Sequence, residues 1–238
     1  ETVIEIANGC ICTIHPLCLL EIVSESLFRP AYVKRIKSLQ ETPSAFILYG
    51  ESDSDLKQLS GSSVYISPTC SPEAYHSNMP LEKRPFNIAS TCIQNGMPKK
   101  QGLIAMCPAF IDETEEWKGS TTGNRPEGYN AFKNQIAERM LRHLESAWPD
   151  LRGRIKTVDC STPLTLRDYS NSPFGSMYGV KHMTEQYNPL PATRLPGLLL
   201  AGQSIVAPGL LGAMISGFVA CGNIIGHDRL RMEIKKCI

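Results

Sequence analysis

The chain has 238 residues, of which 42% are hydrophobic and 20% are charged, and its formal net charge is +1. These values are typical of a globular protein with one or two domains. Because the charge is near zero and no basic run is interleaved with aromatic residues, the sequence gives no indication of a nucleic-acid partner.

The first half of the chain predicts short strands and two helices. Two β-rich runs, TVIEIANG and CICTI, flank Asn8-Gly9 and predict a hairpin. Residues 15–23 and 30–40 have apolar residues at helical spacing. SAFILYG (44–50) is apolar almost throughout, so we expect a strand buried on both faces. Further strands at 62–67, 86–93 and 102–110 complete an antiparallel meander.

The second half contains the longest predicted helix, residues 125–148, which Pro149 ends. A strand at 153–161, a short helix or turn at 162–170, a buried strand at 197–202 and a helix from Gly209 into the tail follow. Strands and helices do not alternate regularly. The predicted fold class is therefore α+β (mixed α/β), with a mostly antiparallel sheet and flanking helices.

The nine cysteines are scattered, without a C-x-x-C pair, and none lies at zinc-ligand spacing from a histidine. We therefore expect reduced cysteines that act as small hydrophobic residues, a cytoplasmic protein and no metal site. No positively charged segment followed by an apolar one is visible at the start, so the sequence predicts no signal peptide.

The stretch from Leu195 to Gly226 contains no Asp, Glu, Lys or Arg. Its glycines and Pro208 would leave unsatisfied backbone groups in a bilayer, so they favour a strand, a loop and a helix over a membrane span. On the helix, small residues lie on one side and large residues lie opposite. Either a neighbouring element packs against the small side, or free amides at the helix start hold a ligand phosphate. The small residues are Gly209, Gly212 or Ala213, Ser216 or Gly217, and Ala220.

A longer pattern includes this stretch. It consists of Thr162-Pro163, Gly175, Tyr178-Gly179, the strand Gly197–Gly202, Pro208-Gly209, Gly212-Ala213 and Ser216-Gly217. In this order and spacing it resembles the carboxy-terminal part of flavin-dependent oxidoreductases of the phytoene desaturase type, a group that includes carotenoid isomerases and retinol saturases. G-x-G-x-x-G occurs nowhere in the chain, so a self-contained dinucleotide site is absent from the sequence.

The resemblance implies a substrate-binding domain at residues 1–160 and, at residues 161–238, a segment that returns to the FAD-binding domain. The N-terminal Rossmann unit of such enzymes would be missing and would act as a partner from the same polypeptide. The start at Glu1 lies within a predicted strand. We therefore expect a piece of a longer polypeptide that is inactive by itself.

The resemblance also implies the site residues. Gly202 and Gln203 would lie near the FAD pyrophosphate and ribityl chain, and Leu211, Gly212, Ala213 and Met214 would open the helix that points at the flavin. Gln203 departs from the acidic residue that many related flavoproteins have there. Phe174 and Tyr178 would line the substrate side, although a role of Tyr178 in the core is equally open.

No catalytic acid or base stands out in the sequence. His15 precedes a proline at a strand end and is expected to be structural, and His182 lies in a polar loop as a candidate for proton transfer. Arg167 and Asp168 are expected on a solvated face. Few catalytic side chains are expected, because the flavin would carry the electron chemistry.

The resulting hypothesis is hydride transfer between a lipophilic, polyene-like substrate and FAD, with NAD(P) or another acceptor regenerating the flavin. Peripheral contact with a membrane would suit such a substrate. Two alternatives remain open: an amine oxidase-like or protoporphyrinogen oxidase-like flavoprotein, and a non-catalytic binding module that has lost its cofactor.

Overall fold

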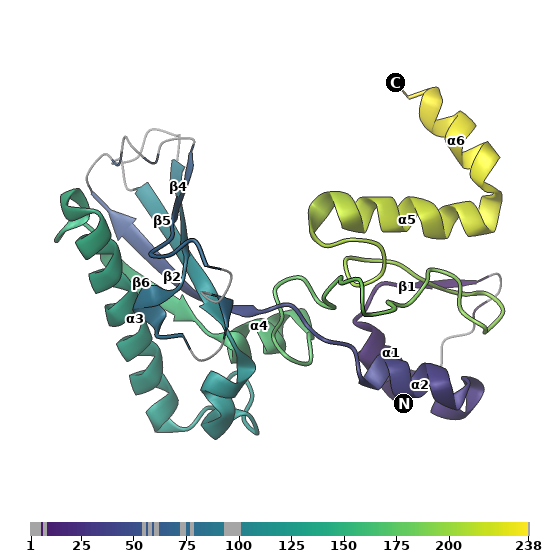
Figure 1. Cartoon of the computed structure of the whole chain (residues 1–238), viewed down its shortest axis with the longest axis horizontal. Helices are drawn as coiled ribbons and strands as arrows, with labels where there is room; N and C mark the ends of the chain where they lie inside the picture. Colours follow the sequence, from purple (N-terminus) through teal and green to yellow (C-terminus); the bar gives the residue numbers. More distant parts are fainter. Residues whose placement is uncertain are drawn as a thin grey trace. The chain divides into compact units, whose positions relative to one another are not determined.

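The computed structural model describes residues 6, 9–53, 56, 59, 62–71, 75–76, 79–92 and 101–237. It divides into two compact units (Figure 1). The sheet unit is Pro43–Ser170, and the terminal unit combines Glu1–Thr42 with Asn171–Ile238. The first 42 residues therefore pack with the C-terminal segment, whereas the prediction placed them with residues 43–160 in one substrate-binding domain. The substrate-binding role of residues 1–160 stays a prediction.

The sheet unit is built on a five-stranded antiparallel sheet with the order β3-β4-β5-β2-β6. The strands β3, β4 and β5 are neighbours in both sequence and space, which confirms this part of the predicted meander and the mixed fold class. The prediction that β2 belongs to the same meander is wrong, because β2 pairs with β5 and β6 and not with β3. The strand bounds are Ser44–Ser52 for β2, Ser63–Ile66 for β3, Phe86–Cys92 for β4, Gln101–Ala109 for β5 and Lys156–Ser161 for β6.

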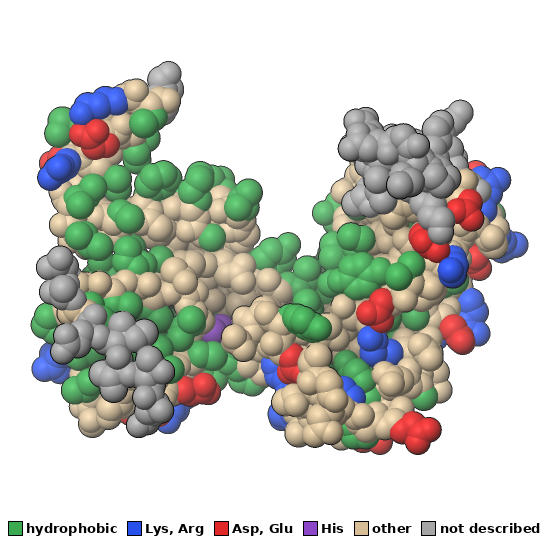
Figure 2. Space-filling view, turned by 180° about the vertical axis from the view of Figure 1, so that it is seen from behind, with side chains coloured by type: hydrophobic (Ala, Val, Ile, Leu, Met, Phe, Trp, Pro, Cys, Tyr) green, Lys and Arg blue, Asp and Glu red, His purple; other side chains and the backbone are tan. Residues whose placement is uncertain are grey.

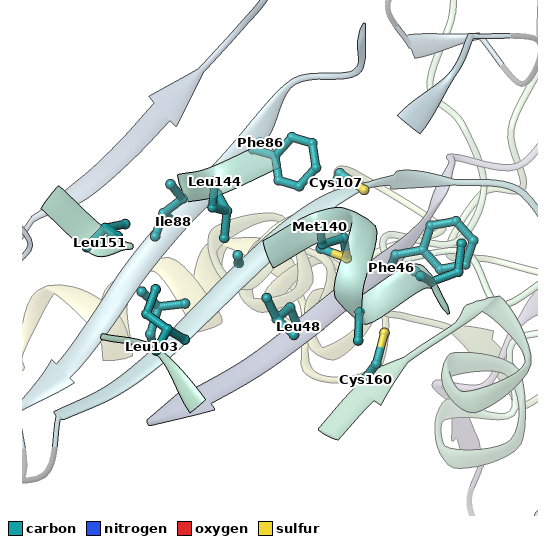
Figure 3. Close-up of a cluster of buried hydrophobic side chains, with 14 of the residues drawn as sticks. Phe46, Leu48, Phe86, Ile88, Leu103, Cys107, Met140, Leu144, Leu151 and Cys160 are labelled. Atoms are coloured by element: carbon teal, nitrogen blue, oxygen red, sulfur yellow. The ribbon is translucent and has the colours of Figure 1, made fainter. Parts of the chain in front are cut away.

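The long helix α3 (Glu127–Ala147) lies along one face of this sheet, as Figure 1 shows. Alternate residues of β5 are buried, as expected of a strand with one face against a core. Ser44 to Leu48 of β2 are all buried, which confirms the prediction for SAFILYG. Figure 3 shows side chains from the strands and from α3, including Phe46, Leu103, Met140 and Leu144, meeting in the main core.

In the described part of the sheet unit, further short helices are η4 (Leu81–Lys83), η5 (Ile111–Trp117), η6 (Pro149–Leu151) and α4 (Pro163–Ser170). The helix α4 confirms the predicted short helix after Thr162. The expectation that its Arg167 and Asp168 lie on a solvated face is wrong, because their side chains are only 18% and 12% exposed.

Asp168 accepts hydrogen bonds from Arg125 Nη2 at 2.5 Å, from the Thr122 backbone N–H at 2.7 Å and from Arg167 Nε at 2.9 Å. Burial by itself would raise the pKa of Asp168, but the hydrogen bonds from Arg167 and Thr122 outweigh it and hold that pKa below its usual value. This carboxylate therefore joins α4 to the segment before α3.

The terminal unit contains a two-stranded parallel sheet, in which β1 (Cys10–Cys12) pairs with β7 (Leu198–Leu200). The predicted hairpin around Asn8-Gly9 falls mostly outside the described residues. A second core of side chains from both halves of the unit, including Leu19, Ile36 and Leu200, holds the unit together. Its helices are α1 (Pro16–Ile22), η1 (Glu25–Leu27), α2 (Pro30–Lys37), α5 (Gly209–Ile225) and α6 (His227–Lys235).

The last two helices are separated at Gly226, whose φ of +90° stops the first one. Within the described part of the chain, no helix combines the length and the apolar character needed to cross a bilayer.

Eight cysteines have described side chains, and all eight are free thiols. Cys107 and Cys160 are buried in the main core, and this burial raises the pKa of each thiol to about 12. Cys70 and Cys237, by contrast, are exposed. The prediction of reduced cysteines acting as small hydrophobic residues therefore fits Cys107 and Cys160 best.

We expect the buried and the exposed thiols to differ in reactivity. At pH 8, iodoacetamide should modify Cys70 and Cys237 in the folded chain and leave Cys107 and Cys160 unmodified, because alkylation requires a thiolate and access. Peptide mass spectrometry measures the modification at each site, and the chain in urea serves as the control in which all four should react. Rapid modification of Cys107 without denaturant would contradict the buried core.

Candidate functional site

The strand β7, the loop after it and helix α5 form one connected substructure. In that loop Gly202 has a φ of +112°, a conformation that favours glycine. Its backbone N–H donates a hydrogen bond of 2.9 Å to Oγ of Ser216, which is fully buried on α5. The loop is therefore fixed to the helix two turns after the helix begins.

The small-residue side of α5 faces the protein. Gly212, Ser216 and Ala220 are buried at four-residue spacing, so they lie on one face of the helix. A Cβ atom added to Gly212 would collide with the carbonyl group and the side chain of Ala207, in the preceding loop. Of the two explanations for the small residues, packing against the chain itself therefore accounts for these three.

The opposite side of α5 is apolar and exposed. Leu211 is 63% exposed and Met214 is 53% exposed, while Ile215 and Phe218 are exposed to a smaller extent, 41% and 40%. Figure 2 shows hydrophobic side chains gathered along this helix. At the helix start, Pro208 provides no side-chain hydrogen bond, and a Cβ added at Gly209 would meet nothing within 4 Å. The start of α5 is thus open to close approach.

The segment with the predicted substrate-lining residues packs on the loop with the predicted cofactor residues. A Cβ at Gly179 would collide with Ser204 Oγ, which also accepts a hydrogen bond of 3.3 Å from the Val180 N–H. Gln203 Nε2 lies 3.5 Å from the Met177 carbonyl oxygen, and His182 Nε2 lies 3.3 Å from the Gln203 carbonyl oxygen.

The structure therefore brings Gln203 together with residues 177–182. Phe174 and Tyr178 lie on this same segment, and they are 41% and 45% exposed. An exposed Tyr178 argues against its role as a core aromatic residue. Gly212 is buried, Ala213 is half-buried, and the side chains of Leu211 and Met214 point to the exposed side of α5.

Sequence reasoning missed one polar cluster beside this segment. His15 Nε2 lies 2.8 Å from Glu41 Oε1, and Ser176 Oγ donates a hydrogen bond of 2.8 Å to Glu41 Oε2. These residues are 26 and 135 positions apart in sequence, so no local pattern indicates the cluster.

No family model matches the chain. All-trans-retinol 13,14-reductase of Homo sapiens is 29% identical over 148 residues, which cover 60% of this chain and 24% of that protein. The protein of the same name from Danio rerio is 29% identical over 142 residues, or 57% of this chain and 23% of that protein.

A further relative from Danio rerio, named inactive all-trans-retinol 13,14-reductase, is 26% identical over 51% of this chain and 21% of that protein. The chain spans about a quarter of the length of the curated relatives it matches. These matches confirm the predicted resemblance to the retinol saturase group, and the chain is a homologue of proteins named all-trans-retinol 13,14-reductase.

Proposed function

We propose that this chain is the carboxy-terminal portion of a flavin-dependent oxidoreductase that transfers hydride between FAD and a lipophilic polyene. The names of the relatives favour a retinol-like substrate and the direction of reduction. The observation that carries the proposal is the open start of α5, next to a loop against which the aromatic-bearing segment packs.

The residues at this site are compatible with FAD. The free amides of an uncapped helix start can donate to a polar or anionic group of the cofactor. No acidic side chain occurs between Leu195 and Gly226 that would repel a phosphate. The space beside Gly209 would let the cofactor approach the backbone closely, and a larger side chain at this position would reduce that space.

Residue by residue, the contributions would differ. The N–H of Gly202 is already donated to Ser216, so Gly202 would act through its backbone turn instead of a direct contact. Gln203 is half-buried and could present its amide to a cofactor hydroxyl. The free main-chain amides of the first turn are those of Gly209, Leu210 and Leu211, because the amides of Gly212 and Ala213 donate within the helix. Gly212 would act through its close packing on the loop, Ala213 would lie beside it, and Leu211 and Met214 would contribute apolar contact beside the ring.

When bound, FAD would supply the electron chemistry, and the side chains of this protein would bind and orient the substrate and exclude water. Phe174 and Tyr178 are exposed aromatic residues four positions apart. A conjugated polyene is flat and apolar, so it would gain from contact with such rings. Peripheral association with a membrane would give a substrate of this kind access to the site.

The cofactor test uses absorbance. We expect the complete polypeptide, purified with added FAD, to show the visible absorption bands of a flavin, in roughly one-to-one ratio with protein. The 238-residue chain alone should retain little FAD, because it contains no G-x-G-x-x-G sequence. A complete polypeptide that stays colourless after reconstitution with FAD would contradict the proposal.

A non-catalytic module is the second candidate, because one relative is named inactive. Consumption of all-trans-retinol under reducing conditions distinguishes the two. A complete polypeptide that binds no FAD and turns over no retinoid would favour the module.

A further inference from the structure

A chain of hydrogen bonds inside the terminal unit converges on the carboxylate of Glu41. Its Oε1 atom lies 2.8 Å from His15 Nε2, and its Oε2 atom accepts from Ser176 Oγ at 2.8 Å. Ser176 Oγ lies 2.7 Å from Ser172 Oγ. The side chains of His15 and Glu41 are 6% and 11% exposed, and both serines are buried. Because water has little access, these groups depend on one another for their hydrogen bonds.

The direction of each hydrogen bond follows from its neighbours. The backbone N–H of Leu17 can only donate, and it lies 3.1 Å from Nδ1 of His15. Nδ1 is therefore the acceptor nitrogen, and the proton of the neutral ring is on Nε2, which donates to Glu41. Ser176 donates its hydroxyl proton to the carboxylate, so its oxygen accepts from Ser172. All donors therefore point toward Glu41.

This order of groups excludes nucleophilic catalysis by a serine-histidine-carboxylate triad. In a nucleophilic triad the histidine lies between the serine and the carboxylate, where it removes the hydroxyl proton. Here the carboxylate lies between Ser176 and His15. The cluster therefore holds parts of the chain in place.

The part that it holds is the segment from Ser172 to Val180. Ser172 and Ser176 flank Phe174, and Glu41 itself forms a β-bridge with Val180. The next residue, Thr42, accepts a hydrogen bond of 3.1 Å from the Tyr178 N–H and donates one of 3.0 Å to the Gly179 carbonyl oxygen. The backbone of the segment is thus fixed along Glu41 and Thr42, while the side chains of Phe174 and Tyr178 remain exposed.

We propose that Glu41 is a positioning residue, which sets the place of Phe174 and Tyr178 at the substrate site by holding His15 and Ser176. The inference rests on the proposed function, in which these two aromatic residues contact a polyene. A binding surface that is already ordered loses less conformational entropy when the ligand binds. Loss of Glu41 should therefore weaken substrate binding more than it slows the chemical step.

The structural half of the inference is tested by amide hydrogen exchange on the 238-residue chain. Glu41→Ala removes both acceptors, so peptides covering residues 172–180 should exchange roughly tenfold faster than in the parent chain. Glu41→Gln keeps the size and one acceptor oxygen, so its effect should be smaller. Ser176→Ala removes one donor and should affect the same peptides, which keeps the test decisive if Glu41→Ala does not fold.

Glu82→Gln is the matched control. Glu82 also accepts two hydrogen bonds from a basic side chain, Arg139, at 2.8 and 3.0 Å, but it belongs to the sheet unit. Exchange in residues 172–180 should not change in this variant. Unchanged exchange there in Glu41→Ala and Ser176→Ala, both folded, would overturn the inference.

The functional half uses the complete polypeptide with FAD and all-trans-retinol as the probe. Glu41→Ala should raise the KM and the dissociation constant for retinol roughly tenfold and change kcat by less than about threefold. Partial recovery in Glu41→Gln would support positioning. Retinol affinity that stays unchanged while residues 172–180 exchange faster would overturn the link to the substrate. A parent protein that binds no FAD and no retinol would contradict the proposed function, whereas the exchange result would still show whether Glu41 fixes the segment.

Discussion

Replacing Glu113 with alanine is expected to lower the free energy of unfolding by about 3–5 kcal/mol, because it leaves a buried guanidinium without its counter-charge. Arg84 is only 3% exposed. Its Nη1 and Nη2 atoms donate to the two carboxylate oxygens of Glu113, at 2.9 and 2.7 Å. Glu113 also accepts from the backbone N–H of Phe110 at 2.9 Å, so the same carboxylate orders the start of η5.

The other donors of Arg84 reach the carbonyl oxygens of Met79 and Pro108, both at 2.9 Å. These contacts would persist in the variant, and they satisfy hydrogen bonds without supplying negative charge. The free energy of unfolding that Glu113→Ala loses is therefore mainly electrostatic, and a second substitution that removes the Arg84 charge should reduce this loss. Arg84→Met combined with Glu113→Leu should recover part of the stability, because it removes the stranded charge.

Glu115→Ala is the matched control on the same short helix. Glu115 pairs with Lys118, but the two side chains are 60% and 54% exposed, so this ion pair should contribute less than about 1 kcal/mol. Urea unfolding followed by circular dichroism measures both variants. Similar small losses for Glu113→Ala and Glu115→Ala would show that Arg84 is solvated in solution.

The elements that could be predicted from the sequence are those with local signals. The period of apolar residues indicated α3, and the continuous apolar run of residues 44–50 indicated β2 as a buried strand. The glycines and Pro208 correctly divided the apolar C-terminal stretch into a strand, a loop and a helix. In each case the residues that determine the structure are neighbours in sequence.

Features that depend on distant partners could not be predicted in this way. The strand β1 pairs with β7, which is 188 residues later in the chain, and no local pattern encodes that choice. The sequence alone suggests that Arg167 and Asp168 lie on the surface. In the structure Arg125, which is 43 residues before Asp168, donates a hydrogen bond to the Asp168 carboxylate. A charged residue is buried only when its partner is present, and a sequence pattern does not show the partner.

The candidate site also combines features with a local signal and features that depend on distant partners. The small residues of α5 were visible in the sequence, but their spacing suited both a neighbouring element and a ligand. In the structure Gly212 and Ser216 contact the preceding loop, whereas the helix start remains open, so packing explains the first two and the ligand role stays a prediction. The cluster around Glu41 carried no comparable signal, since it joins three segments that are far apart in sequence.

The second substitution with a large expected effect is at Gly212, on the face of α5 that packs against the preceding loop. A methyl group at this position would collide with the carbonyl oxygen, the carbonyl carbon and the Cβ atom of Ala207. Two of these are backbone atoms, so the loop itself must move. We expect Gly212→Ala to lower the free energy of unfolding by about 1–3 kcal/mol, the usual cost of overpacking, although alanine is the better helix former.

Gly217→Ala is the control within the same helix, because a Cβ added there would meet nothing within 4 Å. It should stabilise the chain by about 0.5–1 kcal/mol through helix propensity alone, so the two substitutions should have opposite signs. Thermal or urea unfolding of the 238-residue chain measures both. In the complete polypeptide, Gly212→Ala should also reduce FAD content, because movement of Ala207 shifts the loop between Gly202 and the helix start. Stabilisation by both substitutions would mean that α5 does not lie against this loop, and the proposed cofactor site would lose its structural basis.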